Sequence, residues 1–262
     1  MAYEFLTLEI DTRGVAFVTL NRPEVHNAFD EKLIAEITQV FAELDKNTSV
    51  RLGLISGAGK SFCAGGDLNW MRKMKDYSRD ENIADSAQLE AMFATVAGFS
   101  KPLIGKIHGN AIGGGSGLTA VCDFVVASDD AKFGFTEARL GIAPSVISPY
   151  VIEKIGPSYA RAYFLSGMFF STQIAKDMGL VHRVAPFAQL QAATEEIIGE
   201  FLKAAPAAAQ RSKALINAIK TMKREDVRDY TIQTIADLRV SAEGQEGMEA
   251  VLSKRKPKWA AQ

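Results

Sequence analysis

The sequence contains few residues that bind metals or form disulfides. Its 262 residues include two cysteines, Cys63 and Cys122, and three histidines. The cysteines lie far apart and form no C-x-x-C motif, so we expect two buried, reduced thiols instead of a disulfide or a zinc site. The histidines have no metal-ligand spacing, and we expect them in loops or at the edge of the core. The sequence therefore predicts no bound metal.

Long apolar runs and an excess of charge are also missing. No segment has the roughly 18 consecutive apolar residues of a membrane span, and residues 1–8 do not join a basic region to an apolar stretch. The net charge of −1 does not favour nucleic acid or a membrane surface as a partner. A hydrophobic fraction of 47% is ordinary for a globular protein. We expect a cytoplasmic protein with neither kind of partner.

The first half of the chain alternates between strands, helices and glycine-rich loops. Short runs of β-branched and aromatic residues predict strands, and apolar residues at spacings of three and four predict helices. Asp30 is the expected N-cap of the first helix. The expected strands are residues 3–10, 15–20, 51–56, 103–107 and 124–127, and helices are expected from residues 30, 67, 84 and 118. This order indicates an α/β core with parallel strands.

From Pro149 onward the pattern is mainly helical. Helices are expected over residues 172–178, 186–203, 206–222 and about 240–252. We therefore divide the chain into a core at residues 1–200 and a helical C-terminal region at 201–262, which we expect to serve assembly.

Two familiar motifs fail on their spacing. Residues 57–61, Gly-Ala-Gly-Lys-Ser, resemble the end of a phosphate-binding loop, but Leu54 stands where that motif needs its first glycine. Ser116 lies among glycines, but Leu118 stands where a nucleophile elbow needs glycine. The sequence therefore favours neither a nucleotide triphosphate site nor a serine nucleophile.

Two glycine-rich loops, residues 57–66 and 109–117, each follow a strand and precede a helix. Glycine allows sharp turns and close approach of the backbone to a ligand, and the N–H groups at helix starts favour negative charge. Two such loops facing each other can place two N–H donors on one oxygen. Such an oxyanion hole commonly contributes roughly 100- to 1000-fold in rate per donor. The alternative is that both loops are only tight connections.

One carboxylate, Glu137, follows the second loop among apolar residues. Burial there would raise its pKa and suit it to general acid or base catalysis. The alternatives are an exposed glutamate or a structural ion pair with Arg139.

Short motifs follow one another over essentially the whole chain. They are Asn21-Arg22-Pro23 with Asn27-Ala28, residues 61–68, His108-Gly109-Asn110-Ala111 with Gly113-Gly114-Gly115, Cys122-Asp123, Glu137 with Leu140-Gly141, Gly179-Leu180-Val181, and residues 254–257. In this order they resemble the crotonase, or enoyl-CoA hydratase/isomerase, superfamily. The resemblance implies a repeated ββα spiral core followed by C-terminal helices, which cap the active site and assemble trimers or dimers of trimers.

The resemblance also implies roles for individual residues. The oxyanion-hole donors fall on Gly66 and Gly114, and the acid–base group on Glu137. The CoA moiety is expected near Ala28, Ala64, Asp67 and Leu68, and Lys254 is expected to approach its phosphates in the same or a neighbouring subunit. CoA belongs to the thioester substrate, and no permanently bound cofactor is implied.

The chain departs from the family pattern at Gly117. Typical hydratases carry two glutamates that hold the added water, and the earlier one would fall at this position. A single carboxylate at Glu137 can still transfer a proton, as in certain family isomerases. Three serines near the motifs are candidates to replace the missing group: Ser116, Ser145 and Ser148.

Two further runs, residues 67–71 and 147–151, resemble bacterial methylglutaconyl-CoA hydratases of leucine degradation and their relatives of acyclic terpene degradation. This subgroup accepts glycine at the position of Gly117. The sequence therefore predicts hydration of an α,β-unsaturated acyl-CoA, with 3-methylglutaconyl-CoA as the favoured substrate. Three basic residues could face its distal carboxylate or form a solvated helix face: Arg72, Lys73 and Lys75. The alternatives are an enoyl-CoA isomerase and a non-catalytic acyl-CoA-binding protein.

Overall fold

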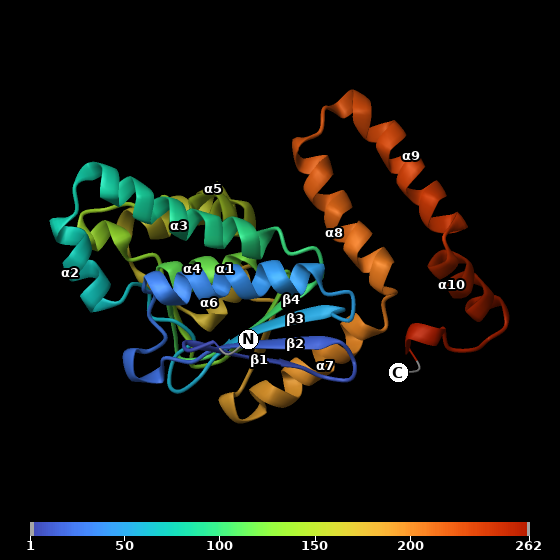
Figure 1. The fold of residues 1–262 in the computed structure, drawn as a ribbon, viewed down its shortest axis with the longest axis horizontal. Helices are drawn as coiled ribbons and strands as arrows, with labels where there is room; N and C mark the ends of the chain where they lie inside the picture. The colour runs from blue at the N-terminus through green and yellow to red at the C-terminus, as the bar shows by residue number, and fades with distance from the viewer. Residues whose placement is uncertain (1–2, 261–262) are drawn as a thin grey trace.

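A six-stranded sheet lies at the centre of the computed structural model, which describes residues 3–260 (Figure 1). The strand order is β1-β2-β3-β4-β6-β9; β1 is antiparallel to β2, and every later pair is parallel. The α/β core with parallel strands is therefore confirmed. The strands are β1 (Leu6–Ile10), β2 (Val15–Leu20), β3 (Leu52–Gly57), β4 (Leu103–Ile107), β6 (Phe124–Ser128) and β9 (Arg183–Ala185).

Helices cover both faces of this sheet (Figure 1). α1 (Glu31–Lys46) and α3 (Arg79–Ala97) lie on one face, where Phe41 packs edge-to-face on Phe99 at 5.4 Å between ring centroids. α7 (Leu190–Leu202) covers the other face through the buried side chain of Ile198. Apolar residues buried on both faces explain why the strands read as nearly continuous hydrophobic runs.

A smaller, three-stranded sheet stands beside the second glycine-rich loop. Its order is β5-β7-β8, with strands β5 (Asn110–Ile112), β7 (Lys132–Gly134) and β8 (Phe169–Ser171). The sequence did not predict these strands, because three residues are too few to show a period of two. The buried helix α4 (Gly114–Val121) leaves this sheet directly after β5.

Two helix starts show how local sequence sets the element bounds. Asp30 caps α1 as expected, and its carboxylate accepts the N–H of Leu33 at 2.8 Å. α3 begins earlier than expected, because Ser78 and Glu81 form a reciprocal capping box. The expected start at residue 84 was therefore wrong by about a turn.

The middle of the chain connects the core to the C-terminal helices. α5 (Ser148–Ser166) contains a break at Gly156, where φ is 73°, and α6 (Thr172–Asp177) ends shortly before Gly179. The expected helix at residues 186–203 is a short 3₁₀ turn, Phe187–Gln189, followed by α7.

Three helices extend beyond the sheet to one end of the long axis (Figure 1). They are α8 (Pro206–Thr221), α9 (Arg224–Val240) and α10 (Ala242–Leu252). The helix expected at about residues 240–252 begins slightly later, because Ser241 is the N-cap of α10. No bounds were predicted for the helix that the structure shows as α9. The two-part division at residue 200 stays a prediction, and its outer ends, residues 1–2 and 261–262, lie outside the described residues.

Candidate active site

The two glycine-rich loops lie side by side. The N–H of Cys63 donates to the carbonyl of Asn110 at 3.0 Å, and the N–H of Ile112 donates to the carbonyl of Cys63 at 3.0 Å. The first loop follows β3 and the second surrounds β5, so the parallel strands deliver both loops to the same end of the sheet.

Glycine is required where these loops touch. A Cβ on Gly115 would stand 2.3 Å from the Cys63 carbonyl oxygen, and one on Gly65 would stand 3.2 Å from the Ile112 oxygen. Gly65 also has a φ of +96°, which side chains disfavour. The loops therefore approach to backbone contact, which explains the glycine clusters in the sequence.

Gly66 and Gly114 present backbone N–H groups at this junction. The bridge between Phe29 and Gly66 uses the N–H groups of Phe29 and Asp67, and Gly114 is the first residue of α4. Within residues 3–260, neither glycine N–H donates to a protein acceptor. Unpaired N–H groups at a helix start are suited to bind an oxygen that carries negative charge.

The carboxylate of Glu137 lies next to the second loop. A Cβ built on Gly113 would stand 3.2 Å from its Oε1, while its Oε2 is buried without a hydrogen-bond partner among the described residues. Burial raises the pKa of Glu137 above its usual value. Arg139 instead donates to the carbonyl of Ser166 at 3.4 Å and lies over the Phe169 ring, so the structure forms no Glu137–Arg139 ion pair.

These groups line one cavity of about 230 Å³. Gly66, Gly114 and Glu137 all contribute to its wall, together with apolar side chains from α2 (Leu68–Asp76), α3 and the segment before α5. The cavity thus brings together the three residues that the sequence predicted as catalytic.

Four of the residues predicted to contact CoA lie in or beside the end of the first loop: Ala28, Ala64, Asp67 and Leu68. Ala64 lines the cavity, Leu68 is 68% exposed at the start of α2, and Asp67 caps α2 by accepting the N–H of Asn69 at 2.7 Å. Ala28 is buried beside them, next to Phe29, whose N–H donates to Gly65 at 2.7 Å. Their closeness is a finding, whereas their contact with CoA stays a prediction.

Arg22 organises this region, and the sequence reasoning gave it no role. Its Nη2 lies 3.1 Å from Asp67 and 3.0 Å from Asp30, and its Nη1 donates to the Ala28 carbonyl at 2.6 Å. One buried guanidinium therefore links the N-caps of α1 and α2. The sequence showed Arg22 within the Asn21-Arg22-Pro23 motif. It did not indicate that Arg22 pairs with the carboxylate of Asp67, which is 45 residues later in the chain.

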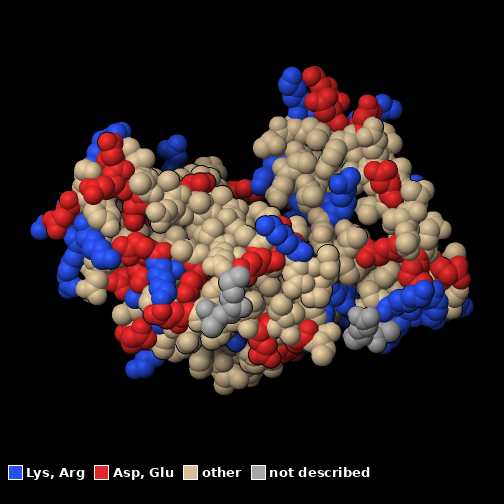
Figure 2. Space-filling model, viewed as in Figure 1, with Lys and Arg blue, Asp and Glu red and all other residues tan. Residues whose placement is uncertain are grey.

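Lys254 is not near this cavity within its own chain. It follows α10, while α2 lies at the opposite end of the long axis (Figure 1). Basic side chains gather beside the C-terminal end of the chain (Figure 2). There Arg255 pairs with Glu246 at 2.6 Å. Contact between Lys254 and CoA, in the same or a neighbouring subunit, stays a prediction.

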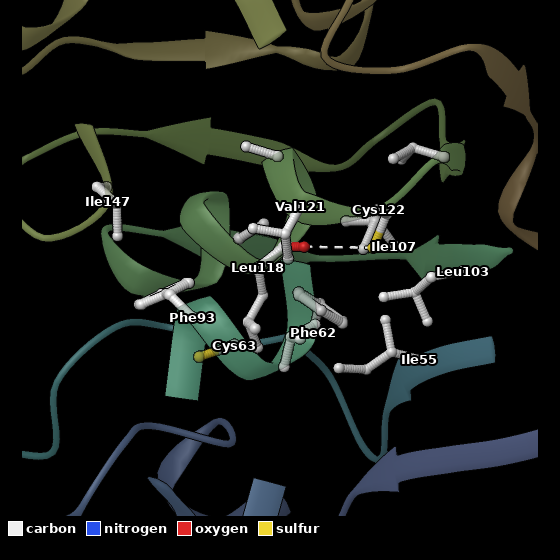
Figure 3. Close-up of a cluster of buried hydrophobic side chains, with 14 of the residues drawn as sticks. Ile55, Phe62, Cys63, Phe93, Leu103, Ile107, Leu118, Val121, Cys122 and Ile147 are labelled. Carbon is white, nitrogen blue, oxygen red and sulfur yellow. Dashed lines mark hydrogen bonds between the residues drawn. The ribbon is translucent and has the colours of Figure 1, made fainter. Parts of the chain in front are cut away.

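Ile147 fills the space beside Gly117, where a second carboxylate was expected. A Cβ on Gly117 would meet Ile147 Cγ2 at 2.5 Å and Phe93 Cε1 at 3.0 Å. Figure 3 shows both side chains within the buried cluster around α4. The position is therefore closed to a larger residue as the core is packed.

Of the three serines considered as replacements, only Ser145 lines the cavity. Ser116 is fully buried and donates to the Ala111 carbonyl at 2.6 Å, and Ser148 donates to Ser145 at 2.7 Å. Ser116 and Ser148 therefore have structural partners.

The basic residues of α2 form a solvated face. Arg72, Lys73 and Lys75 are exposed and do not line the cavity; Arg72 donates to Asn69, and Lys73 pairs with Glu31 at 2.9 Å. Figure 2 shows basic and acidic side chains interspersed on this end of the molecule. Sequence reasoning missed a different polar residue, Asp85 on α3, which does line the cavity.

The thiols and histidines have structural places. Cys63 and Cys122 are free and buried, and burial raises both thiol pKa values to about 12. His182 accepts the Val125 N–H at 2.9 Å, and burial lowers its pKa to about 4.

Residues 3–260 contain no group of three or more His, Cys, Asp or Glu suited to a metal ion. Among the same residues, no helix has both the length and the hydropathy of a membrane span.

The two-sheet α/β core, the touching glycine loops and the trailing helices define a crotonase-fold protein. The chain belongs to the enoyl-CoA hydratase/isomerase family, whose sequence profile matches residues 11–262.

Solved structures of similar proteins agree over nearly the full length. An enoyl-CoA hydratase from Shewanella pealeana is 36% identical, with a TM-score of 0.93 and coverage of 98% of this chain and 96% of that one. An enoyl-CoA hydratase from Mycobacterium smegmatis is 31% identical, with a TM-score of 0.93 and coverage of 98% and 99%. AtuE from Pseudomonas aeruginosa is 33% identical, with a TM-score of 0.95 and coverage of 98% and 100%.

Proposed function

We propose that this protein hydrates an α,β-unsaturated acyl-CoA. The observation that carries the proposal is one cavity lined by Glu137, Gly66 and Gly114. Among the described residues, Oε2 of Glu137 is buried without a hydrogen-bond partner, and the N–H groups of both glycines donate to no acceptor. The two similar solved hydratases support the same reaction class.

The thioester carbonyl is the group that the N–H donors would bind. Addition at the β carbon moves negative charge onto the thioester oxygen, and donors already oriented toward that oxygen stabilise the resulting enolate. Gly114 contributes from the start of α4, where the aligned peptide dipoles add to this stabilisation.

Glu137 would carry the proton in both halves of the reaction. The ionised carboxylate accepts a proton from water as the water oxygen bonds to the β carbon, and the electron pair of the double bond moves into the enolate. The protonated Glu137 then donates that proton to the α carbon. The atoms of one water are thereby added, and the carboxylate is restored; a raised pKa makes this group a stronger base.

A second candidate is isomerisation of a 3-enoyl-CoA, in which Glu137 moves one proton between carbons. The filled space beside Gly117 favours it, because no carboxylate can stand at that position to hold water together with Glu137. Purified protein with 2-enoyl-CoA and 3-enoyl-CoA thioesters separates the two. Hydration consumes the ultraviolet absorbance of the conjugated thioester, whereas isomerisation of a 3-enoyl-CoA creates it.

The third alternative is an acyl-CoA-binding protein without catalysis. It predicts binding of a saturated acyl-CoA but no turnover of either thioester. The unpaired Oε2 of Glu137 disfavours it, because a buried carboxylate without a partner costs stability that a binding role does not require.

The finer substrate prediction was 3-methylglutaconyl-CoA, with leucine degradation as its setting. Its support is the sequence resemblance at residues 67–71 and 147–151. The cation expected for its distal carboxylate was Arg72, Lys73 or Lys75, and none of these lines the cavity. This substrate is therefore one member of the acyl-CoA panel that tests the function.

We propose that CoA enters only as part of the substrate, that no other cofactor is bound, and that the chain works in the cytoplasm. We also propose a homotrimer or a dimer of trimers. Exposed apolar side chains on the C-terminal helices support assembly: Ile216, Ile232, Ile235, Val240, Val251 and Leu252. Light scattering of the purified protein tests the mass, with three or six copies expected.

A further inference from the structure

Asp85 is a second acidic side chain in the cavity that Gly66, Gly114 and Glu137 line. It lies on α3, and its Oδ1 accepts the indole N–H of Trp70 at 3.0 Å. Trp70 belongs to α2 and is 5% exposed. A buried indole therefore holds the carboxylate of Asp85 at the cavity wall.

The charge balance of the cavity follows from this position. Asp85 and Glu137 are the charged residues among the described residues that line it, and no lysine or arginine joins them. Oδ2 of Asp85 has no hydrogen bond or ion pair to a described residue. Burial also raises the pKa of Asp85, as expected for a carboxylate that lacks a cation.

We infer that Asp85 selects acyl-CoA substrates with a neutral acyl tail over those with a distal carboxylate. The inference rests on the proposed function, because it concerns the acyl group in the same cavity. A second carboxylate brought into a partly desolvated cavity is repelled by Asp85 and finds no cation among the described lining residues. An apolar tail meets the remaining wall, which includes Met74 and Leu89.

Two five-carbon thioesters test this selectivity. Glutaconyl-CoA and 2-pentenoyl-CoA differ only in a terminal carboxylate against a methyl group. The wild type is expected to have a higher kcat/KM for 2-pentenoyl-CoA. Asp85→Asn removes the charge and keeps an oxygen that accepts the Trp70 N–H, so it is expected to raise the ratio of glutaconyl to pentenoyl kcat/KM by about tenfold or more.

Glu90→Gln is the matched control. Glu90 is exposed on the same helix and does not line the cavity, so the ratio is expected to stay at its wild-type value. A wild type that prefers glutaconyl-CoA overturns the inference, as does an Asp85→Asn ratio equal to that of the wild type.

Two further outcomes are distinguishable. If neither thioester is hydrated, the proposed function fails, and the inference fails with it. If Asp85→Asn does not fold, binding of glutaryl-CoA and pentanoyl-CoA to the wild type decides. Weaker binding of glutaryl-CoA supports the inference, and equal or tighter binding contradicts it.

Discussion

Ile147 occupies the space that a side chain at residue 117 would need. Its Cγ2 lies 2.5 Å from the position of a Cβ on Gly117, well inside van der Waals contact. An apolar side chain from the segment before α5 thus occupies the space where the expected second carboxylate would begin. Restoring a glutamate alone would force Ile147 out of the core.

Packing at this pair predicts a strong coupling between two substitutions. Gly117→Ala adds a methyl group against Ile147 and is expected to lower the free energy of unfolding by about 1–3 kcal/mol. In Ile147→Ala the space opens, so Gly117→Ala should cost much less in that background. Denaturant unfolding of the four proteins of this cycle gives the coupling; additive effects would contradict the contact.

Substitution of the two glycines proposed as oxyanion-hole donors, Gly66 and Gly114, should give unequal losses of activity. A Cβ on Gly114 would stand 2.5 Å from the Phe29 ring, whereas one on Gly66 would meet the flexible end of Met71 at 3.1 Å. Gly114→Ala therefore displaces its N–H and is expected to lower kcat by roughly 100- to 1000-fold. Gly66→Ala should lower it less. Steady-state hydration kinetics compare them, and an equal or reversed order would rule out this packing argument.

Burial of Glu137 predicts a pH-dependent stability difference. Because its pKa is raised above 4.5 in the folded protein, the unfolded chain loses the proton first as pH rises. The wild type therefore loses stability relative to Glu137→Gln between pH 4.5 and the folded-state pKa, and the difference is constant above it. Urea unfolding of both proteins across this range checks the sign, and a wild type that gains stability relative to Glu137→Gln as pH rises would be inconsistent with a buried carboxylate.

Substitution of Arg22 is expected to destabilise the protein strongly, because Arg22 forms ion pairs with Asp30 and Asp67. Arg22→Met leaves Asp67, which is 4% exposed, without its cation and is expected to lower the free energy of unfolding by about 3 kcal/mol. Adding Asp67→Asn removes the uncompensated charge, so the double variant should recover part of the loss. Thermal or denaturant unfolding measures both, and a double variant no more stable than Arg22→Met would refute the ion-pair account.

Much of the core could be predicted because its signals are local. The helix after Asp30 and the strand at residues 15–20 follow from spacing within one element, and the glycine loops follow from their position between strand and helix. The three-residue strands of the second sheet lack such a signal. Their residues pair only because the loops bring distant segments together.

The same difference between local signals and contacts of distant segments applies to the residues of the candidate site. Gly66, Gly114 and Glu137 were predicted from loops and from family motifs. Asp85 was not, because nothing near it in the sequence indicates that α3 turns it toward the cavity and that Trp70 holds it there. The closed space at Gly117 was likewise invisible, since Ile147 is 30 residues away.

Hydration of 2-pentenoyl-CoA by the wild type and by Glu137→Gln tests the central claim most directly. The loss of conjugated-thioester absorbance is measured alongside binding of pentanoyl-CoA. The account predicts that the wild type hydrates the thioester, and that Glu137→Gln binds pentanoyl-CoA but hydrates roughly 10²- to 10⁴-fold more slowly. Hydration by Glu137→Gln at the wild-type rate would contradict it.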